Sequence, residues 1–170
     1  MGRILDVGSA GDVHARRAGV LAHALDQVRP RLRLAVVYGG KADDPGAVLR
    51  RTYNPRPWKS YEAVARDIAG ALAALGFAAV ELFPEDLDLA AKLAGFAPDL
   101  VWLNTGGVQG DAPMAHAPAL LEMLGLPYVG PSPLNAATLD AKHVFKTQLL
   151  GLGLPTSPFA TWAEGDGHGD

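Results

Sequence analysis

The sequence predicts an α/β fold, a three-layer, Rossmann-like domain with about four parallel strands and helices on both faces of the sheet. Two observations support this prediction. Short apolar runs typical of buried strands alternate with segments of helical periodicity, and glycine or proline ends nearly every element. Because strand–helix–strand crossovers are almost always right-handed, this alternation favours a single parallel sheet. The expected strands are residues 32–38, 77–83, 100–103 and 128–130.

Length and composition are those of one soluble globular domain. The chain has 170 residues, of which 49% are hydrophobic and 19% charged, with a net charge of −3 and no cysteine. This charge balance argues against nucleic acid as a partner, because binding along a phosphate backbone requires a coherent positive surface. No apolar run reaches the roughly 18 residues of a membrane span, and the N-terminus lacks the features of a signal peptide. We therefore expect a cytoplasmic protein with no membrane partner.

The chain divides into three parts. Residues 1–31 form an N-terminal extension with an extra helix, whose apolar stripe includes Val20, Leu21 and Leu25. We expect this stripe to be buried against the domain or against a second copy in a homodimer, because an exposed stripe favours self-association. Residues 32–155 form the α/β domain. Residues 156–170 are expected to link it to a further lobe.

Two loops follow expected strands. The first, from Lys41 to Lys59, is longer than most strand-to-helix connections, and long loops at this edge of a parallel sheet are commonly functional. Its Asp43 and Asp44 precede a proline, so they either form a turn or supply a carboxylate to a site. The second loop, residues 104–111, is rich in glycine and could present backbone N–H groups to an anion.

The last expected helix carries Lys142 and Lys146, which are four residues apart and share one face. By spacing alone these lysines are either a solvated pair or part of a site. The sequence before them, residues 124–130, reads Leu-Gly-Leu-Pro-Tyr-Val-Gly, and residues 153–156 read Gly-Leu-Pro-Thr. This combination resembles the end of the N-terminal, pre-ATP-grasp domain of the D-alanine–D-alanine ligases, members of the ATP-grasp superfamily.

The resemblance extends over residues 33–159 and is most specific in the last forty or so. The family has adjacent aspartate and lysine residues where this chain has Asp140, Ala141 and Lys142. We therefore place more weight on the lysine than on the aspartate.

The resemblance also implies a substrate site at the strand ends. Asp44 stands near the position of a family glutamate that holds the ammonium of the first amino acid. Gly107 and Asp111 match positions in the family's His-Gly-x-x-Gly-Glu-Asp-Gly element, whose histidine is replaced here by Gly106. Ser132 lies one residue after the family's site serine, and its alternative role is to cap the following helix.

The activity that the resemblance implies is ATP-dependent carboxylate–amine ligation, as used in peptidoglycan biosynthesis for the cell wall. ATP phosphorylates a carboxylate, and an amine then attacks the acyl phosphate to form a peptide bond. In a full-length enzyme the partners are ATP, Mg²⁺ and a small amino-acid-like substrate, and Lys142 reaches the nucleotide phosphates. The magnesium ligands and most of the adenine pocket lie in two later lobes, so no catalytic residue or metal ligand is assigned here.

Two interpretations remain open. In the first, this chain is the N-terminal domain of such a ligase, is inactive alone, and binds neither ATP nor Mg²⁺ tightly. In the second, it is a free-standing, non-catalytic α/β module that binds a small metabolite or a partner protein through the same strand ends.

Overall fold

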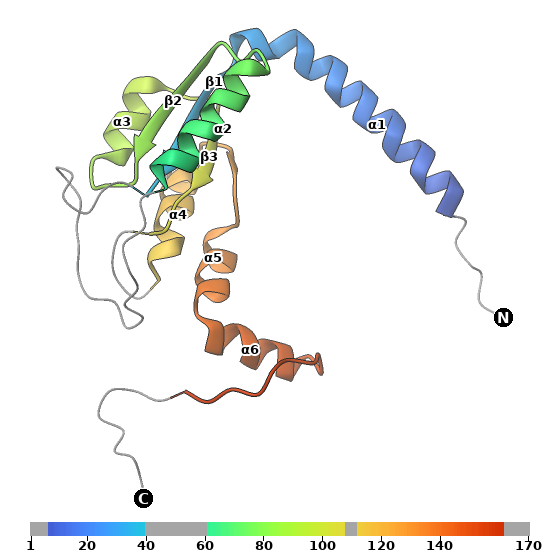
Figure 1. Ribbon diagram of the computed structural model, residues 1–170, viewed down its shortest axis with the longest axis vertical. Helices are drawn as coiled ribbons and strands as arrows, with labels where there is room; N and C mark the ends of the chain where they lie inside the picture. The colour runs from blue at the N-terminus through green and yellow to red at the C-terminus, as the bar shows by residue number, and fades with distance from the viewer. Residues whose placement is uncertain (1–6, 40–60, 108–111, 162–170) are drawn as a thin grey trace, which may run out of the picture.

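The computed structural model describes residues 7–39, 61–107 and 112–161, with side chains from residue 13 onward (Figure 1). None of the helices in these ranges is long and apolar enough to cross a membrane. In chain order the elements are α1 (Val7–Val28), β1 (Arg33–Tyr38), α2 (Glu62–Ala74), β2 (Ala79–Pro84), α3 (Leu89–Phe96), β3 (Leu100–Asn104), α4 (His116–Met123), β4 (Tyr128–Val129), α5 (Pro133–Asp140) and α6 (Lys142–Gly151), with 3-10 turns at Arg29–Arg31 and Pro113–Ala115.

The four strands form one parallel sheet in the order β2-β1-β3-β4, which confirms the predicted fold class. From β1 the chain adds β2 on one side and then β3 on the other, so the direction of winding reverses between β1 and β3. Ligands of open α/β sheets bind at such a reversal, outside the carboxyl ends of the strands. Tyr38 and Asn104 are partners in the register of the two strands and mark this position.

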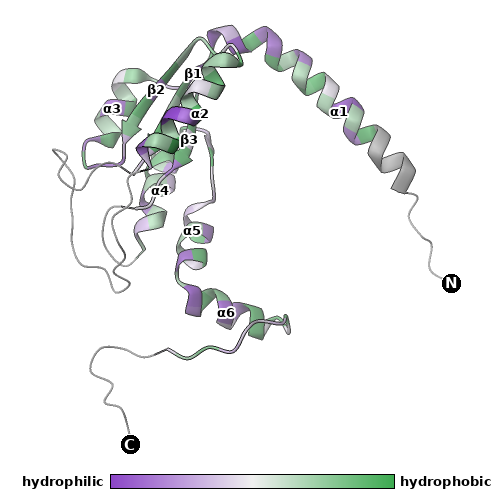
Figure 2. Cartoon of the chain, in the orientation of Figure 1, coloured by the Kyte–Doolittle hydropathy of each residue, from purple (hydrophilic) through white to green (hydrophobic). Residues whose placement is uncertain are grey.

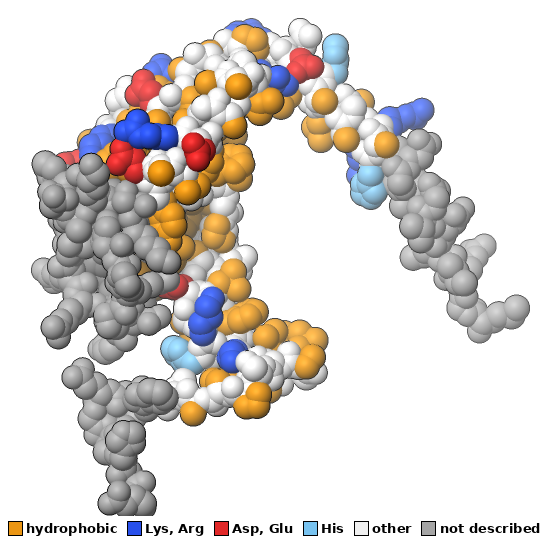
Figure 3. Space-filling view, in the orientation of Figure 1, with side chains coloured by type: hydrophobic (Ala, Val, Ile, Leu, Met, Phe, Trp, Pro, Cys, Tyr) orange, Lys and Arg blue, Asp and Glu red, His pale blue; other side chains and the backbone are white. Residues whose placement is uncertain are grey.

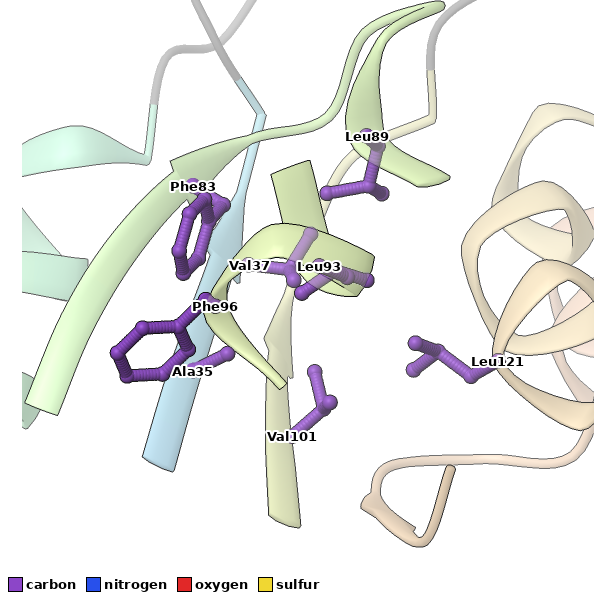
Figure 4. Close-up of a cluster of buried hydrophobic side chains, with 8 residues drawn as sticks. All are labelled: Ala35, Val37, Phe83, Leu89, Leu93, Phe96, Val101 and Leu121. Carbon is purple, nitrogen blue, oxygen red and sulfur yellow. The ribbon is translucent and has the colours of Figure 1, made fainter. Parts of the chain in front are cut away.

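Helices cover both faces of the sheet and complete the three layers. The strands are the most apolar part of the fold (Figure 2). On one face, α3 and α4 close over a buried cluster (Figure 4), which consists of Ala35, Val37, Phe83, Leu89, Leu93, Phe96, Val101 and Leu121. On the other face, α2 packs over a second cluster, which consists of Leu34, Val36, Ala65, Ala69 and Leu72. Successive residues of β1 therefore point into different clusters, as expected for a strand buried on both faces.

Helix α1 projects away from the sheet and is anchored at its C-terminal end (Figure 1). There, Arg29 Nη1 donates a hydrogen bond to the backbone carbonyl of Leu75 (2.6 Å). The apolar stripe lies on the exposed length of the helix, with exposed fractions of 65% at Val20, 69% at Leu21 and 38% at Leu25. The prediction that the domain buries this stripe is therefore wrong, because the helix leaves the domain instead of folding back across it. Burial in a homodimer stays a prediction, as do the three domain boundaries.

The core can be tested at Leu93, which is fully buried between α3 and the sheet. We expect Leu93→Ala to lower the free energy of unfolding by about 2–5 kcal/mol, because it removes buried apolar atoms and leaves a cavity. Leu87→Ala is the matched control, since Leu87 is 68% exposed. Urea unfolding measures both variants, and equal losses at the two positions would contradict the assignment of this core.

Candidate functional site

A crevice lies beside the reversal point of the sheet, where the end of β3 faces the residues that precede and form α5. It consists of two cavities of about 170 and 210 Å³ that share Met114 and Pro131 in their walls. We call these two cavities together the crevice. Its inner part is lined by Leu103, Asn104, Thr105 and Pro118, and its outer part by Ala136, Leu139, Asp140 and Lys142.

Lys142 lines the outer part of the crevice, and Lys146 is not among the lining residues. The ammonium of Lys142 donates a hydrogen bond to the carbonyl of Leu139 (2.6 Å) and the side chain remains exposed. Lys146 instead donates to Ser157 Oγ (2.6 Å). The structure thus separates the two lysines, and only Lys142 is placed to meet a ligand in the crevice.

Lys142 and Lys146 lie on one helix, α6, as expected, and a separate helix, α5, precedes it. Helix α5 ends at Asp140, and α6 begins at Lys142 after a break at Ala141, whose ψ of 80° is not helical. Ser132 caps the start of α5, because its hydroxyl accepts a hydrogen bond from the backbone N–H of Asn135 (3.4 Å). The structure therefore supports the capping role of Ser132, whereas substrate binding by this residue stays a prediction.

Gly107 ends the described part of the turn that follows β3. Its φ is +79°, and a Cβ at this position would lie 2.5 Å from Pro113 Cβ. Both the backbone conformation and the lack of space therefore require glycine. The Gly107 N–H donates to Glu85 Oε2 at 3.2 Å. Gly107 lies two residues after Thr105, which lines the crevice, and its predicted role in substrate binding is untested.

Glu85 is one residue of this region that the sequence analysis missed. It is only 4% exposed, and burial raises the pKa of its carboxyl group to about 7. The N–H groups of Gly107 and Ala117 and the hydroxyl of Thr105 oppose that rise in pKa. Among the described residues, Glu85 Oε1 has no hydrogen-bond partner. The sequence feature that could have identified Glu85 is its position directly after β2, where the strand ends at the carboxyl edge of the sheet.

Tyr61 is a second residue that the sequence analysis missed. Its N–H donates to the carbonyl of Gly39 (3.2 Å), and its own carbonyl accepts from Asn104 Nδ2 (3.3 Å). A Cβ at Gly106 would lie 2.8 Å from Tyr61 Cε2. The tyrosine ring therefore fills the space that a side chain at position 106 would need. This contact is a physical reason why position 106 is glycine in this chain, where the D-alanine–D-alanine ligases have histidine.

Two predicted site residues, Asp44 and Asp111, lie outside the described residues, as does the loop from Lys41 to Lys59. Their roles stay predictions. Within the described ranges, no group of three or more histidine, aspartate or glutamate residues is placed to hold a metal ion.

Comparison with known proteins confirms the resemblance. No family model matches the chain. The D-alanine–D-alanine ligase of Moorella thermoacetica is 34% identical over 133 residues, which are 77% of this chain and 37% of that enzyme. The corresponding ligase of a Marinomonas species is 28% identical over 134 residues, 77% of this chain and 38% of the enzyme. The uncharacterized protein y4sG of Sinorhizobium fredii is 33% identical over 119 residues, 65% of this chain and 35% of that protein. The chain thus spans little more than a third of the length of these relatives.

The raised pKa of Glu85 predicts that stability depends on pH. The protonated form is favoured by folding, so the stabilising contribution is complete below the pKa of an unfolded glutamate and is lost as pH rises through about 7. Relative to Glu85→Gln, the wild-type chain should lose roughly 2–3 kcal/mol of unfolding free energy between pH 4.5 and 8, at about 1.36 kcal/mol per pKa unit. Urea unfolding across this pH range measures the difference.

Glu81→Gln is the matched control, because Glu81 lies on the same strand and is exposed. Its difference from wild type should not follow this course with pH. A constant difference between wild type and Glu85→Gln at all pH values would show that Glu85 has an ordinary pKa.

The contact between Tyr61 and Gly106 predicts coupling between the two positions. Gly106→Ala should cost about 1–3 kcal/mol of stability through overpacking, and much less in a Tyr61→Ala background, where the ring is gone. A double-mutant cycle measured by urea unfolding gives the coupling energy. Gly70→Ala serves as control, since a Cβ there meets nothing within 4 Å. Additive effects of the two substitutions would refute the contact.

Proposed function

Because this chain is homologous to the D-alanine–D-alanine ligases over three quarters of its length, we propose that it is the N-terminal domain of an ATP-dependent carboxylate–amine ligase. In the proposed reaction, the terminal phosphoryl group of ATP is transferred to a substrate carboxylate, and ADP leaves. The amine of a second substrate attacks the acyl carbon, phosphate leaves, and a peptide bond forms. ATP with Mg²⁺ supplies the activation, and the domain described here contributes to the pocket of the first, amino-acid-like substrate.

The placement of Lys142 is the observation that carries this proposal furthest within the structure. This lysine lies in the region where the resemblance is most specific, and its side chain lines the outer part of the crevice. An ammonium group at this position supplies a positive charge to an anionic group held nearby. The inner part of the same crevice is lined by Asn104 and Thr105, whose side chains offer hydrogen-bonding groups to the polar atoms of an amino acid.

The open outer side of the crevice is consistent with a domain that works together with others. Lys142 is exposed, and phosphates are held strongly only where other groups exclude water. Helices α5 and α6 extend below the sheet in Figure 1, and the same part of the molecule in Figure 3 shows hydrophobic side chains on its surface. The exposed leucines here include Leu134 and Leu139 on α5, Leu150 on α6 and Leu152 just after α6. Several exposed leucines on two neighbouring helices indicate a candidate interaction site. We propose that the ATP-grasp lobes of the longer ligase cover it.

The proposal predicts different effects for the two lysines. In the parent ligase, or in a fusion of this domain to a matching pair of ATP-grasp lobes, Lys142→Ala should lower the rate of phosphate release roughly 100-fold, the usual scale for losing one electrostatic contact to a reacting group. Lys146→Ala is the matched control and should have a much smaller effect, because Lys146 is bonded to Ser157. If both substitutions have equally small effects, the two lysines are simply solvated and Lys142 does not contact the phosphates.

Calorimetric titration of the 170-residue chain with magnesium–ATP tests the complementary point. We expect no more than weak binding, since one lysine on an open surface does not remove phosphates from water. Micromolar binding by the isolated chain would favour the alternative, a free-standing module that binds a metabolite. The cytoplasmic location expected from the sequence stays a prediction.

A further inference from the structure

We propose that Glu85 is a positioning residue of the crevice: its buried carboxyl group fixes the turn from Thr105 to Gly107, so that Thr105 forms the wall that an amino-acid-like ligand meets. The ligand class rests on the function proposed above, whereas the positioning role rests on the contacts of Glu85 alone.

Glu85 joins three neighbouring strands at one edge of the sheet. It follows β2 directly, and its N–H donates to the carbonyl of Tyr38 at the end of β1 (2.7 Å). Its carboxylate then reaches the turn after β3, where Oε2 accepts from the Gly107 N–H (3.2 Å). Because the strand order is β2-β1-β3, the side chain passes the end of the central strand. A substitution that removes the Glu85 carboxyl group therefore removes a hydrogen bond from the turn after β3.

The turn is held on its other sides as well. Pro113 packs against Gly107, and the ring of Tyr61 packs against Gly106. These contacts limit where the two glycines can lie, but neither contact satisfies the Gly107 N–H. Within the described residues only Glu85 accepts from that N–H. The carboxylate therefore sets the orientation of the peptide group next to the crevice wall.

A carboxyl group is an unfavourable choice if packing were its only purpose. Its burial is costly, and Oε1 has no partner among the described residues. The basic residues of the neighbouring elements are not placed to neutralise it: Lys92 on α3 forms an ion pair with Asp86, and His116, which precedes Ala117, is exposed. A leucine would fill a similar volume at lower cost but would leave the Gly107 N–H without an acceptor. Placement of the turn accounts for a carboxyl group where packing does not.

Three variants of the 170-residue chain separate positioning from packing. Glu85→Leu removes the acceptor, Glu85→Gln keeps an acceptor oxygen but cannot ionise, and Glu81→Gln is the exposed control on β2. Amide hydrogen exchange by NMR should show that Gly107 loses at least about tenfold of its protection in Glu85→Leu, as expected for loss of one hydrogen bond. Glu85→Gln should keep most of this protection, and Glu81→Gln all of it.

A pH titration followed by NMR distinguishes the two roles, because a purely packing role would not make the Gly107 amide shift depend on ionisation of Glu85. The amide shift of Gly107 should titrate near pH 7 in the wild-type chain, should do the same in Glu81→Gln, and should be flat in Glu85→Gln. If the wild-type shift is flat between pH 5 and 9 while Gly107 protection is unchanged in Glu85→Gln and Glu85→Leu, the positioning role is overturned. Glu85→Gln keeps the test decisive if Glu85→Leu does not fold.

Titration with D-alanine tests the ligand class separately. In the wild-type chain we expect the Thr105 amide resonance to shift as D-alanine is added. In Glu85→Leu we expect a smaller shift at equal concentration, whereas Glu85→Gln, which keeps the acceptor oxygen, should keep most of the response. If no crevice resonance responds in the wild-type chain while Gly107 still follows Glu85, binding of the amino acid by this domain is refuted and the positioning role stands. An equal response in all variants would overturn the link between Glu85 and the crevice.

Discussion

Burial of β1 on both faces is the constraint on which the rest of the structure depends. Each residue from Leu34 to Val37 is at most 1% exposed, and successive residues belong to opposite clusters. A strand in this position needs helices on both faces and neighbouring strands on both edges. Its carboxyl end therefore lies in the middle of the sheet edge, where the carbonyls of Tyr38 and Gly39 accept hydrogen bonds from Glu85 and Tyr61. The residues that shape the crevice wall are thus placed by the central strand.

The inner and outer parts of the crevice differ in how they are held. Thr105 belongs to a turn that is tied to the ends of two other strands and packed by Pro113 and Tyr61. Lys142 belongs to α6, which follows α5 and lies away from the sheet (Figure 1). A rigid inner wall suits recognition of a small ligand, because little ordering is needed when it binds. The outer part depends on short helices whose apolar side chains are exposed.

Local sequence signals were sufficient for the sheet, because apolar runs and glycine or proline stops report the burial and ends of individual strands. They were also sufficient for the alternative role of Ser132, since a capping contact spans three residues. Local sequence signals did not predict contacts between residues that are far apart in the chain. The contact of Glu85 with Gly107 spans 22 residues and that of Tyr61 with Asn104 spans 43. The outward course of α1 was missed for a similar reason, since an apolar stripe shows that a surface is amphipathic without showing where the helix points.

The break at Ala141 is a candidate hinge between the two helices beside the outer part of the crevice. Asp140 ends one helix and Lys142 begins the next, so a single non-helical residue joins two rigid rods. Helix α6 has 10 residues and is therefore about 15 Å long, so a rotation of roughly 10° at Ala141 would carry its far end by about 2–3 Å. Lys142 is adjacent to Ala141, so its side chain would change orientation while its backbone position would change little. The ammonium could thus be re-aimed while it stays at the mouth of the crevice, and the displacement would fall on Lys146 and the segment bonded to it.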